Sequence, residues 1–117
     1  MKPLGIHHVA VAVTDLDDAV DFYTRVLGMR LRHDRPGSIG VGAWLDVGAQ
    51  QLHLIETTPA PAPGPHFAVE VSDLDATLGK LRAAGATVTD PVPIGTARQA
   101  FLTDPSGNAI ELHEPST

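Results

Sequence analysis

The sequence predicts an α+β fold built from two tandem βαβββ modules whose mixed sheets curl around a cleft. Three observations lead to this prediction: a strand-and-helix pattern occurs twice, a run of short strands follows each copy, and a proline-rich segment separates the copies. Neither module is large enough to bury its own sheet, so the two must pack as a pair. We therefore expect a single domain over 1–117, with module 1 at about 1–56, a linker at 57–65 and module 2 at about 66–117.

The internal repeat is the strongest of these signals. Residues 8–19 read HVAVAVTDLDDA, and residues 66–77, which lie 58 positions later, read HFAVEVSDLDAT. Seven of the twelve aligned positions are identical (His, Ala, Val, Val, Asp, Leu and Asp). Two strands that each lead into a capped helix would share an alternating pattern, but they would not need the same leading histidine. We interpret the pair as a true internal repeat.

In the first module, residues 5–13 alternate as a strand, with valines on one face and His8 on the other. The valine face is the one expected to pack against a helix, and the small neighbours of His8 leave its face open. Thr14 or Asp15 provides an N-cap for a helix that ends at Gly28. The strands that we expect to follow are 29–35, 41–46 and 50–56.

The second module repeats this order of elements. A strand at 66–71 carries His66, Asp73 caps a helix that ends near Gly85, and we expect strands near 86–90, 97–103 and 109–114. The linker at 57–65 reads TTPAPAPGP and has no periodicity, so it is predicted to be a stiff, extended connector.

Composition excludes several classes of function. The 117 residues carry 8 Lys and Arg against 14 Asp and Glu, a net charge of −6, without a basic cluster, which argues against nucleic-acid binding. No apolar run approaches the length of a membrane span, and the N-terminus has no apolar signal segment, so a cytoplasmic location is expected. Because the chain has no cysteine, any metal must be bound by His, Asp or Glu.

The repeat also selects a set of candidate ligands. The offset of 58 that relates His8 to His66 also relates His53 to Glu111. All four fall on the strand face opposite the residues expected to pack on the helices, and an approximate two-fold axis would bring them together. Three imidazoles and a carboxylate suit a divalent ion such as Fe, Mn, Co, Ni or Zn.

Three segments carry a resemblance to a known family: HHVAVAVTDLDDAVDFYTRVLGM, GPHFAVEVSDLDATLGKL and DPSGNAIEL. In this order they resemble the vicinal oxygen chelate (VOC) superfamily, which includes glyoxalase I, bleomycin-resistance proteins, fosfomycin-resistance enzymes, methylmalonyl-CoA epimerase and type I extradiol dioxygenases. The resemblance implies paired βαβββ modules with a divalent metal in the cleft, and its ligands would fall on His8, His53, His66 and Glu111. It also implies a homodimer, with each site either within one chain or shared by two.

The implied activity is that of a metal-dependent enzyme on a small oxygen-rich substrate. Isomerase, lyase or epimerase chemistry through a metal-chelated enediolate is expected first, and dioxygenase chemistry second. Glyoxalase I usually has Glu where this chain has His53, and the epimerases commonly have Gln. Glu111 is thus the one carboxylate among the four ligands, so Glu111 or the neighbouring Glu70 is the candidate base. The alternative is a metal-independent drug-binding protein of the bleomycin-resistance type, whose acidic charge would suit a cationic ligand.

Further side chains on the central strands are candidates for the substrate pocket. Trp44, Arg98 and Phe101, together with Gln99, could line the cleft, and Arg98 could hold a carboxylate or phosphate. His113 shares the strand parity of Glu111 and is a further pocket candidate. His7 and His33 have no counterpart in the repeat and are expected to be structural.

Overall fold

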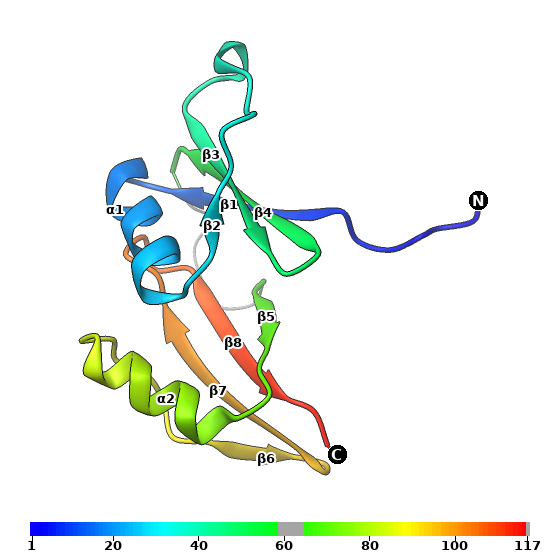
Figure 1. Cartoon of the computed structure of the whole chain (residues 1–117), viewed down its shortest axis with the longest axis vertical. Coiled ribbons are helices and arrows are strands. Elements are labelled where there is room, and N and C mark those ends of the chain that lie inside the picture. Colours follow the sequence, from blue (N-terminus) through cyan, green and yellow to red (C-terminus); the bar gives the residue numbers. More distant parts are fainter. Residues whose placement is uncertain (59–64, 117) are drawn as a thin grey trace. The chain divides into compact units, whose positions relative to one another are not determined.

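The computed structural model describes residues 1–58 and 65–116, and the chain divides into two compact units, Met1–Ala60 and Pro61–Thr117. Each unit contains one four-stranded mixed sheet and one main helical segment (Figure 1). The fold is α+β with two βαβββ modules, as predicted. Most of the predicted linker at 57–65 lies outside the described residues. Among the residues that are described, no helix is long and apolar enough to span a membrane.

In unit 1 the strand order is β1-β4-β3-β2, with β1 parallel to β4 and the other pairs antiparallel. The predicted helix is an α-helical segment that continues as a π-helical turn, and a short 3-10 helix precedes β3. The bounds are β1 His8–Val13, α1 Leu16–Asp21, η1 Phe22–Val26, β2 Arg30–Leu31, η2 Gly37–Ile39, β3 Gly42–Val47 and β4 Gln50–Glu56. Strand β1 is shorter than the expected 5–13, and β2 is shorter than the expected 29–35.

The two faces of the unit 1 sheet differ as predicted. One face supplies fully or almost fully buried side chains that pack under the helical segment, since α1 contacts β3 and β4. The buried set of unit 1 consists of Val13, Ala19, Tyr23, Met29, Ala43, Leu45, Leu52 and Leu54. The opposite face of β4 carries His53, which is half-buried, so the alternation in this strand separates core residues from candidate ligands.

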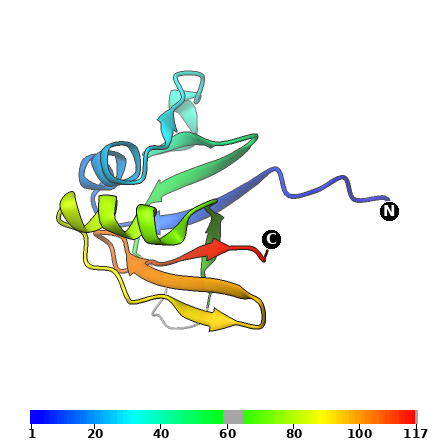
Figure 2. The ribbon, with the colours of Figure 1, turned by 60° about the horizontal axis from the view of Figure 1, so that its bottom comes forward.

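Unit 2 has the same topology, with strand order β5-β8-β7-β6 and β5 parallel to β8. Figure 2 shows α2 lying along one face of this sheet, over β7 and β8. The bounds are β5 Phe67–Glu70, α2 Leu74–Ala83, β6 Val92–Ile94, β7 Ala97–Thr103 and β8 Ala109–Glu114. The buried set of unit 2 consists of Leu74, Leu78, Leu81, Ala100, Leu102, Ile110 and Leu112.

The strand predicted near 86–90 is wrong. This segment makes an isolated antiparallel bridge from Val88 to Leu102, and the edge strand β6 follows it at Val92–Ile94. Proline has no N–H to donate, and Pro91 lies between the bridge and the strand, so the hydrogen-bonded ladder does not run continuously through this segment. Pro93 is accommodated within β6 because β6 is at the sheet edge.

The predicted N-caps are both present and are equivalent. The carboxylate of Asp15 accepts a hydrogen bond from the backbone N–H of Asp18 at 3.0 Å. The carboxylate of Asp73 accepts the corresponding bond from Ala76, also at 3.0 Å. Each bond satisfies one of the backbone donors left free at the start of a helix. The repeated Asp-Leu-Asp sequence is therefore explained by helix capping.

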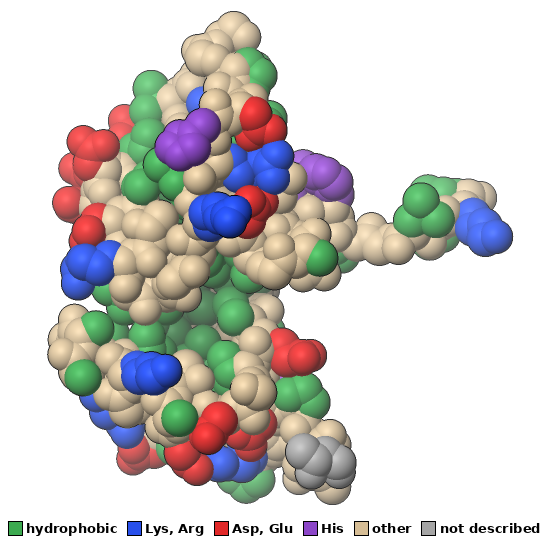
Figure 3. Space-filling view, viewed as in Figure 1, with side chains coloured by type: hydrophobic (Ala, Val, Ile, Leu, Met, Phe, Trp, Pro, Cys, Tyr) green, Lys and Arg blue, Asp and Glu red, His purple; other side chains and the backbone are tan. Residues whose placement is uncertain are grey.

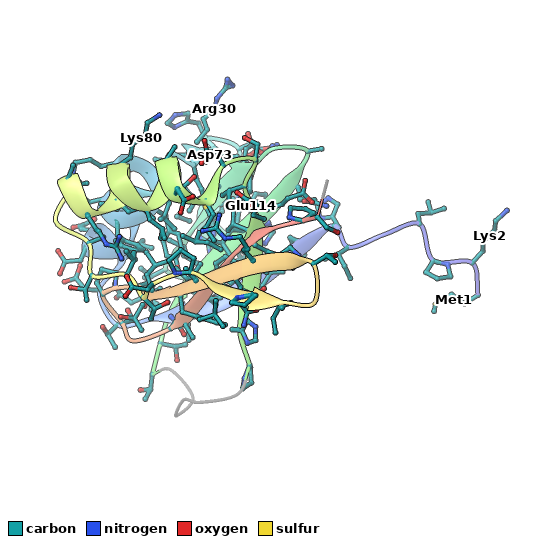
Figure 4. The ribbon with its side chains drawn as sticks, turned by 90° about the horizontal axis from the view of Figure 1, so that it is seen from below. Met1, Lys2, Arg30, Asp73, Lys80 and Glu114 are labelled. Carbon is teal, nitrogen blue, oxygen red and sulfur yellow. The ribbon has the colours of Figure 1, made fainter. Side chains whose placement is uncertain are left out.

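A second capping interaction joins the last strand of each unit to its helix. Glu56 accepts a hydrogen bond from the backbone N–H of Leu16 at 2.9 Å, and Glu114 accepts one from Leu74 at 2.7 Å. Figure 4 shows Asp73 and Glu114 near the N-terminal end of α2. The two glutamates are 58 positions apart, as are the two leucines. The repeat therefore preserves a tertiary contact as well as local sequence.

Candidate functional site

The candidate ligands of unit 1, His8 and His53, lie on neighbouring strands of the sheet. Strands β1 and β4 are in parallel register, with Ala10 opposite His53, and the rings of His8 and His53 stack with centroids 3.8 Å apart and planes within 13°. Trp44 on β3 is directly opposite His53 and stacks on its other side at 4.7 Å and 15°. Three rings from three strands thus form a column on the face opposite the helix.

One nitrogen of each of these two imidazoles lies within hydrogen-bond distance of a neighbouring side chain. Nε2 of His53 lies 2.8 Å from Oε1 of Gln51, an amide oxygen that accepts a hydrogen bond from it. Nδ1 of His8 lies 2.9 Å from Nδ1 of His7. Gln51 was not among the predicted site residues, although its position two residues before His53 places it on the same strand face. Strand parity alone could have identified it.

Burial lowers the pKa of His53 below the ordinary histidine value, and the positive charges that the neighbouring His8, His7, Arg35 and Arg32 can carry lower it further. The Trp44 ring contributes to this environment because it covers one face of the imidazole. Protonation of His53 is disfavoured, so its neutral form, the form that binds a metal ion, is favoured.

The candidate ligands of unit 2, His66 and Glu111, form a direct hydrogen bond. Nε2 of His66 lies 3.1 Å from Oε1 of Glu111. The other carboxylate oxygen, Oε2, lies 3.2 Å from Nδ1 of His113. The Glu111 side chain is 13% exposed, so a largely buried carboxylate lies between two histidines. His113, predicted to line the pocket or to support the ligands from behind, contacts the candidate base directly.

Other predicted site residues lie on both faces of the unit 2 sheet. Phe101 is opposite Glu111 in the ladder, and its ring meets the ring of His66 edge-on with centroids 5.7 Å apart. Glu70 is opposite His113 and exposed, so it shares the face of Glu111.

Arg98 does not line this face. It is opposite Glu114 in the ladder, and its guanidinium donates to Asp75 on α2 at 2.8 and 3.2 Å. Strand alternation is the reason: Arg98 is an odd number of positions from Phe101, so the two side chains leave opposite faces of β7.

By donor type, these residues fit a divalent first-row ion. In unit 2 the separation of 3.1 Å between His66 Nε2 and Glu111 Oε1 matches two adjacent ligands of one octahedral ion, which lie about 3.0 Å apart when each bond is about 2.1 Å. In unit 1 the ring planes of His8 and His53 are nearly parallel, so their in-plane lone pairs do not converge. The distance between the two unit 2 donors therefore allows both to bind one ion, whereas the unit 1 donors are suitable in type but would need a ring rotation to point at one ion.

The candidate ligands are thus found as two pairs, one in each unit. Within 1–58 and 65–116, no group of three or more His, Asp or Glu side chains is arranged to hold a metal ion. On the face shown in Figure 3, acidic and basic side chains are interspersed and form no extended basic patch.

Comparison with known proteins shows the family. A sequence profile of the Glyoxalase/Bleomycin resistance protein/Dioxygenase superfamily matches residues 5–112. A Vibrio cholerae protein named "Probable lactoylglutathione lyase" is 37% identical over 92% of this chain and 88% of its own length.

Two solved structures have the same fold. A Bacillus anthracis protein described as belonging to a glyoxalase family superposes with a TM-score of 0.89 at 29% identity, covering 99% of this chain and 98% of the other. TnmS3, an antibiotic-binding protein of Streptomyces sp. CB03234, superposes with a TM-score of 0.84 at 31% identity, covering 99% of both chains. The chain belongs to the glyoxalase/bleomycin resistance protein/dioxygenase superfamily.

Proposed function

We propose that this protein is a divalent-metal-dependent, glyoxalase-like enzyme that acts on a small oxygen-rich molecule. Isomerase, lyase or epimerase chemistry, in which a proton moves at a carbon next to a carbonyl, is the leading reaction class, and dioxygenase chemistry is second. The observation that supports this most is the equivalence of two donor pairs, His8 with His53 and His66 with Glu111, at one constant offset. The similarity to a lactoylglutathione lyase supports the reaction class.

The four residues would hold one ion, which when bound would polarise a substrate oxygen as a Lewis acid. Glu111 is the proposed base, because its largely buried carboxylate is on the open face of the sheet and can accept a proton. His113 donates to Oε2 of Glu111, so it would orient the carboxylate while Oε1 of Glu111 and Nε2 of His66 bind the ion. Glu70, exposed on the same face, is the second candidate for the base. A cytoplasmic location remains a prediction from the sequence.

Metal analysis tests the proposal directly. Protein purified without chelator should contain about one divalent ion per chain, because one ion needs one pair of each kind. Chelation should remove the ion, and titration with Fe, Mn, Co, Ni or Zn should restore binding and identify the preferred ion. No bound metal as purified, together with no binding of any added ion, would contradict the proposal.

We also propose that the protein is a homodimer, in which the two pairs of one site come either from one chain or from two. Mixing two inactive variants, His8→Ala and Glu111→Gln, distinguishes these arrangements. If sites are shared, a mixed dimer has one site with both changes and one intact site, so activity and metal binding return. If each site lies within one chain, both sites stay defective. Equilibrium sedimentation of the unmixed protein checks that a dimer forms.

A second candidate function is metal-independent binding of a small molecule. It is favoured by the similarity to TnmS3 and by the column of rings formed by Trp44, His53 and His8, which offers aromatic surface to a ligand. The variant His66→Ala distinguishes the two functions. A binder that uses the ring column should keep its affinity when His66 is replaced, whereas a metalloenzyme should lose both metal and activity.

A further inference from the structure

Arg35 in unit 1 is held in a defined position beside the sheet. Its Nη1 donates a hydrogen bond to the carbonyl of Gly40 at 2.8 Å. Its guanidinium also lies against Gly42: a Cβ at that position would be 2.7 Å from Nη2 and 3.0 Å from Cζ. A Cβ at residue 42 would collide first with the backbone carbonyl oxygen of Leu54 on β4 and then with the guanidinium, so the glycine lets β4 and Arg35 both approach β3 closely.

The guanidinium is on the same side of the sheet as the ring column. Gly42 and Trp44 are two positions apart on β3, so their Cα–Cβ directions point to the same face. Trp44 stacks on His53 on this face, and the charge of Arg35 is among those that act on His53. Arg35 is thus a cation beside the aromatic column, on the face opposite the helix.

The charge of Arg35 is not neutralised by a side chain. Four other arginines form ion pairs with carboxylates of this acidic chain: Arg25 with Asp21, Arg32 with Asp34 and Asp46, Arg82 with Asp90, and Arg98 with Asp75 and Glu114. Among the described residues, no Asp or Glu comes within ion-pair distance of Arg35, and its buried Nε has no hydrogen-bond partner. A half-buried guanidinium of this kind has donors to spare, and leaving them unpaired is unfavourable.

We propose that Arg35 binds an oxyanion, a carboxylate or phosphate group, of the small molecule that this protein takes. Nη1 uses one of its two N–H groups on Gly40, so the N–H groups that Nη1 and Nη2 still offer form a pair that can match the two oxygens of such a group. The inference rests on the proposed function and refines it, because it makes the substrate an anionic molecule. It also runs against the expectation, from net charge alone, that the acidic chain would suit a cationic ligand.

Fluorescence of Trp44, the only tryptophan in the chain, provides the readout. Chelator-treated protein is titrated with inorganic phosphate and, separately, with acetate, at constant ionic strength. We expect a saturable change with at least one of these anions, and the more effective one identifies the class of oxyanion. Arg35→Gln should weaken the response at least about tenfold, and Arg35→Lys, which keeps the charge but loses the fork, should be intermediate.

Arg30→Gln is the matched control, because Arg30 is exposed on β2 and its loss removes the same charge. It should leave the response within about twofold of the unchanged protein. No saturable response to either anion, an equal response in Arg35→Gln, or an equal loss in Arg30→Gln would overturn the proposal and leave Arg35 as a clamp of the loop to Gly40. If Arg35→Gln does not fold, the Arg35→Lys and unchanged proteins decide the question. Because the titration uses metal-free protein, its failure is distinguishable from failure of metal binding.

Discussion

Units 1 and 2 share a scaffold but differ in the chemistry of their open faces. Both have the same strand order, and both cap the helix with an aspartate at 3.0 Å and a glutamate from the last strand. At the equivalent positions 53 and 111, however, unit 1 has a histidine within a ring column and unit 2 has a carboxylate between two histidines. Features required for folding recur in both units. The replacement of His53 in unit 1 by Glu111 in unit 2 gives each open face its own chemistry.

The largest effect is expected in the core, where the two units should behave alike. Leu54 and Leu112 are repeat equivalents and are 0% and 2% exposed. Truncating either to alanine removes buried apolar contacts and leaves a cavity, which should lower the free energy of unfolding by about 2–5 kcal/mol. Urea denaturation followed by circular dichroism measures each loss. If one variant is nearly neutral, the two cores are not equivalent.

The next largest effect concerns metal affinity, which should differ between variants of the two units. Glu111→Gln removes the charge from a pair already spaced as two ligands of one ion, so metal affinity should fall at least about 100-fold. His53→Gln changes the equivalent position in unit 1, where the ring planes are parallel and the lone pairs do not converge, and it should cost less. Isothermal titration with the preferred ion measures both affinities. A greater loss for His53→Gln would reverse the comparison.

The sequence predicts much of this arrangement because its signals are local. Alternation places Leu52 and His53 on opposite faces of β4, and Asp15 and Asp73 cap as expected, since each depends on a few neighbouring residues. Of the features that were missed, the capping of Leu74 by Glu114 depends on a contact between distant segments, which no local pattern shows. The contact of Glu111 with His113 depends on the rotamers of the two side chains. The face of Arg98 does follow from strand parity, so this error came from not applying a local signal.

A smaller effect should test whether the second capping interaction is equivalent in the two units. Glu114→Gln and Glu56→Gln each remove a carboxylate that accepts from the first turn of a helix, at a cost of about 1 kcal/mol in the free energy of unfolding. The bond of Glu114 is shorter and more buried than that of Glu56, so its loss should be the larger. Thermal denaturation at low salt measures both, and a larger loss for Glu56→Gln would contradict the ranking.

The smallest effect concerns the environment of His53. Burial lowers its pKa in the folded chain below the unfolded value of about 6.5, so the unfolded chain binds the proton more readily. Above a pH of about 6.5 His53 is neutral in both states and does not affect the free energy of unfolding. As the pH falls from there through the folded pKa, the unfolded chain binds the proton first, so the folded protein loses stability. An NMR titration of chelator-treated protein should therefore give a His53 midpoint below the ordinary value.

Trp44 supplies the control for this shift, because its ring covers one face of the His53 imidazole. Burial is the largest cause of the lowered pKa, so Trp44→Ala should expose His53 to water and move its midpoint back toward the ordinary value. Phe101→Ala is the matched change in unit 2, where the aromatic ring contacts His66 instead, and it should leave the His53 midpoint unchanged. If Trp44→Ala leaves the midpoint low, the positive charges around His53 outweigh burial, and the special environment of unit 1 is electrostatic and not due to the ring column.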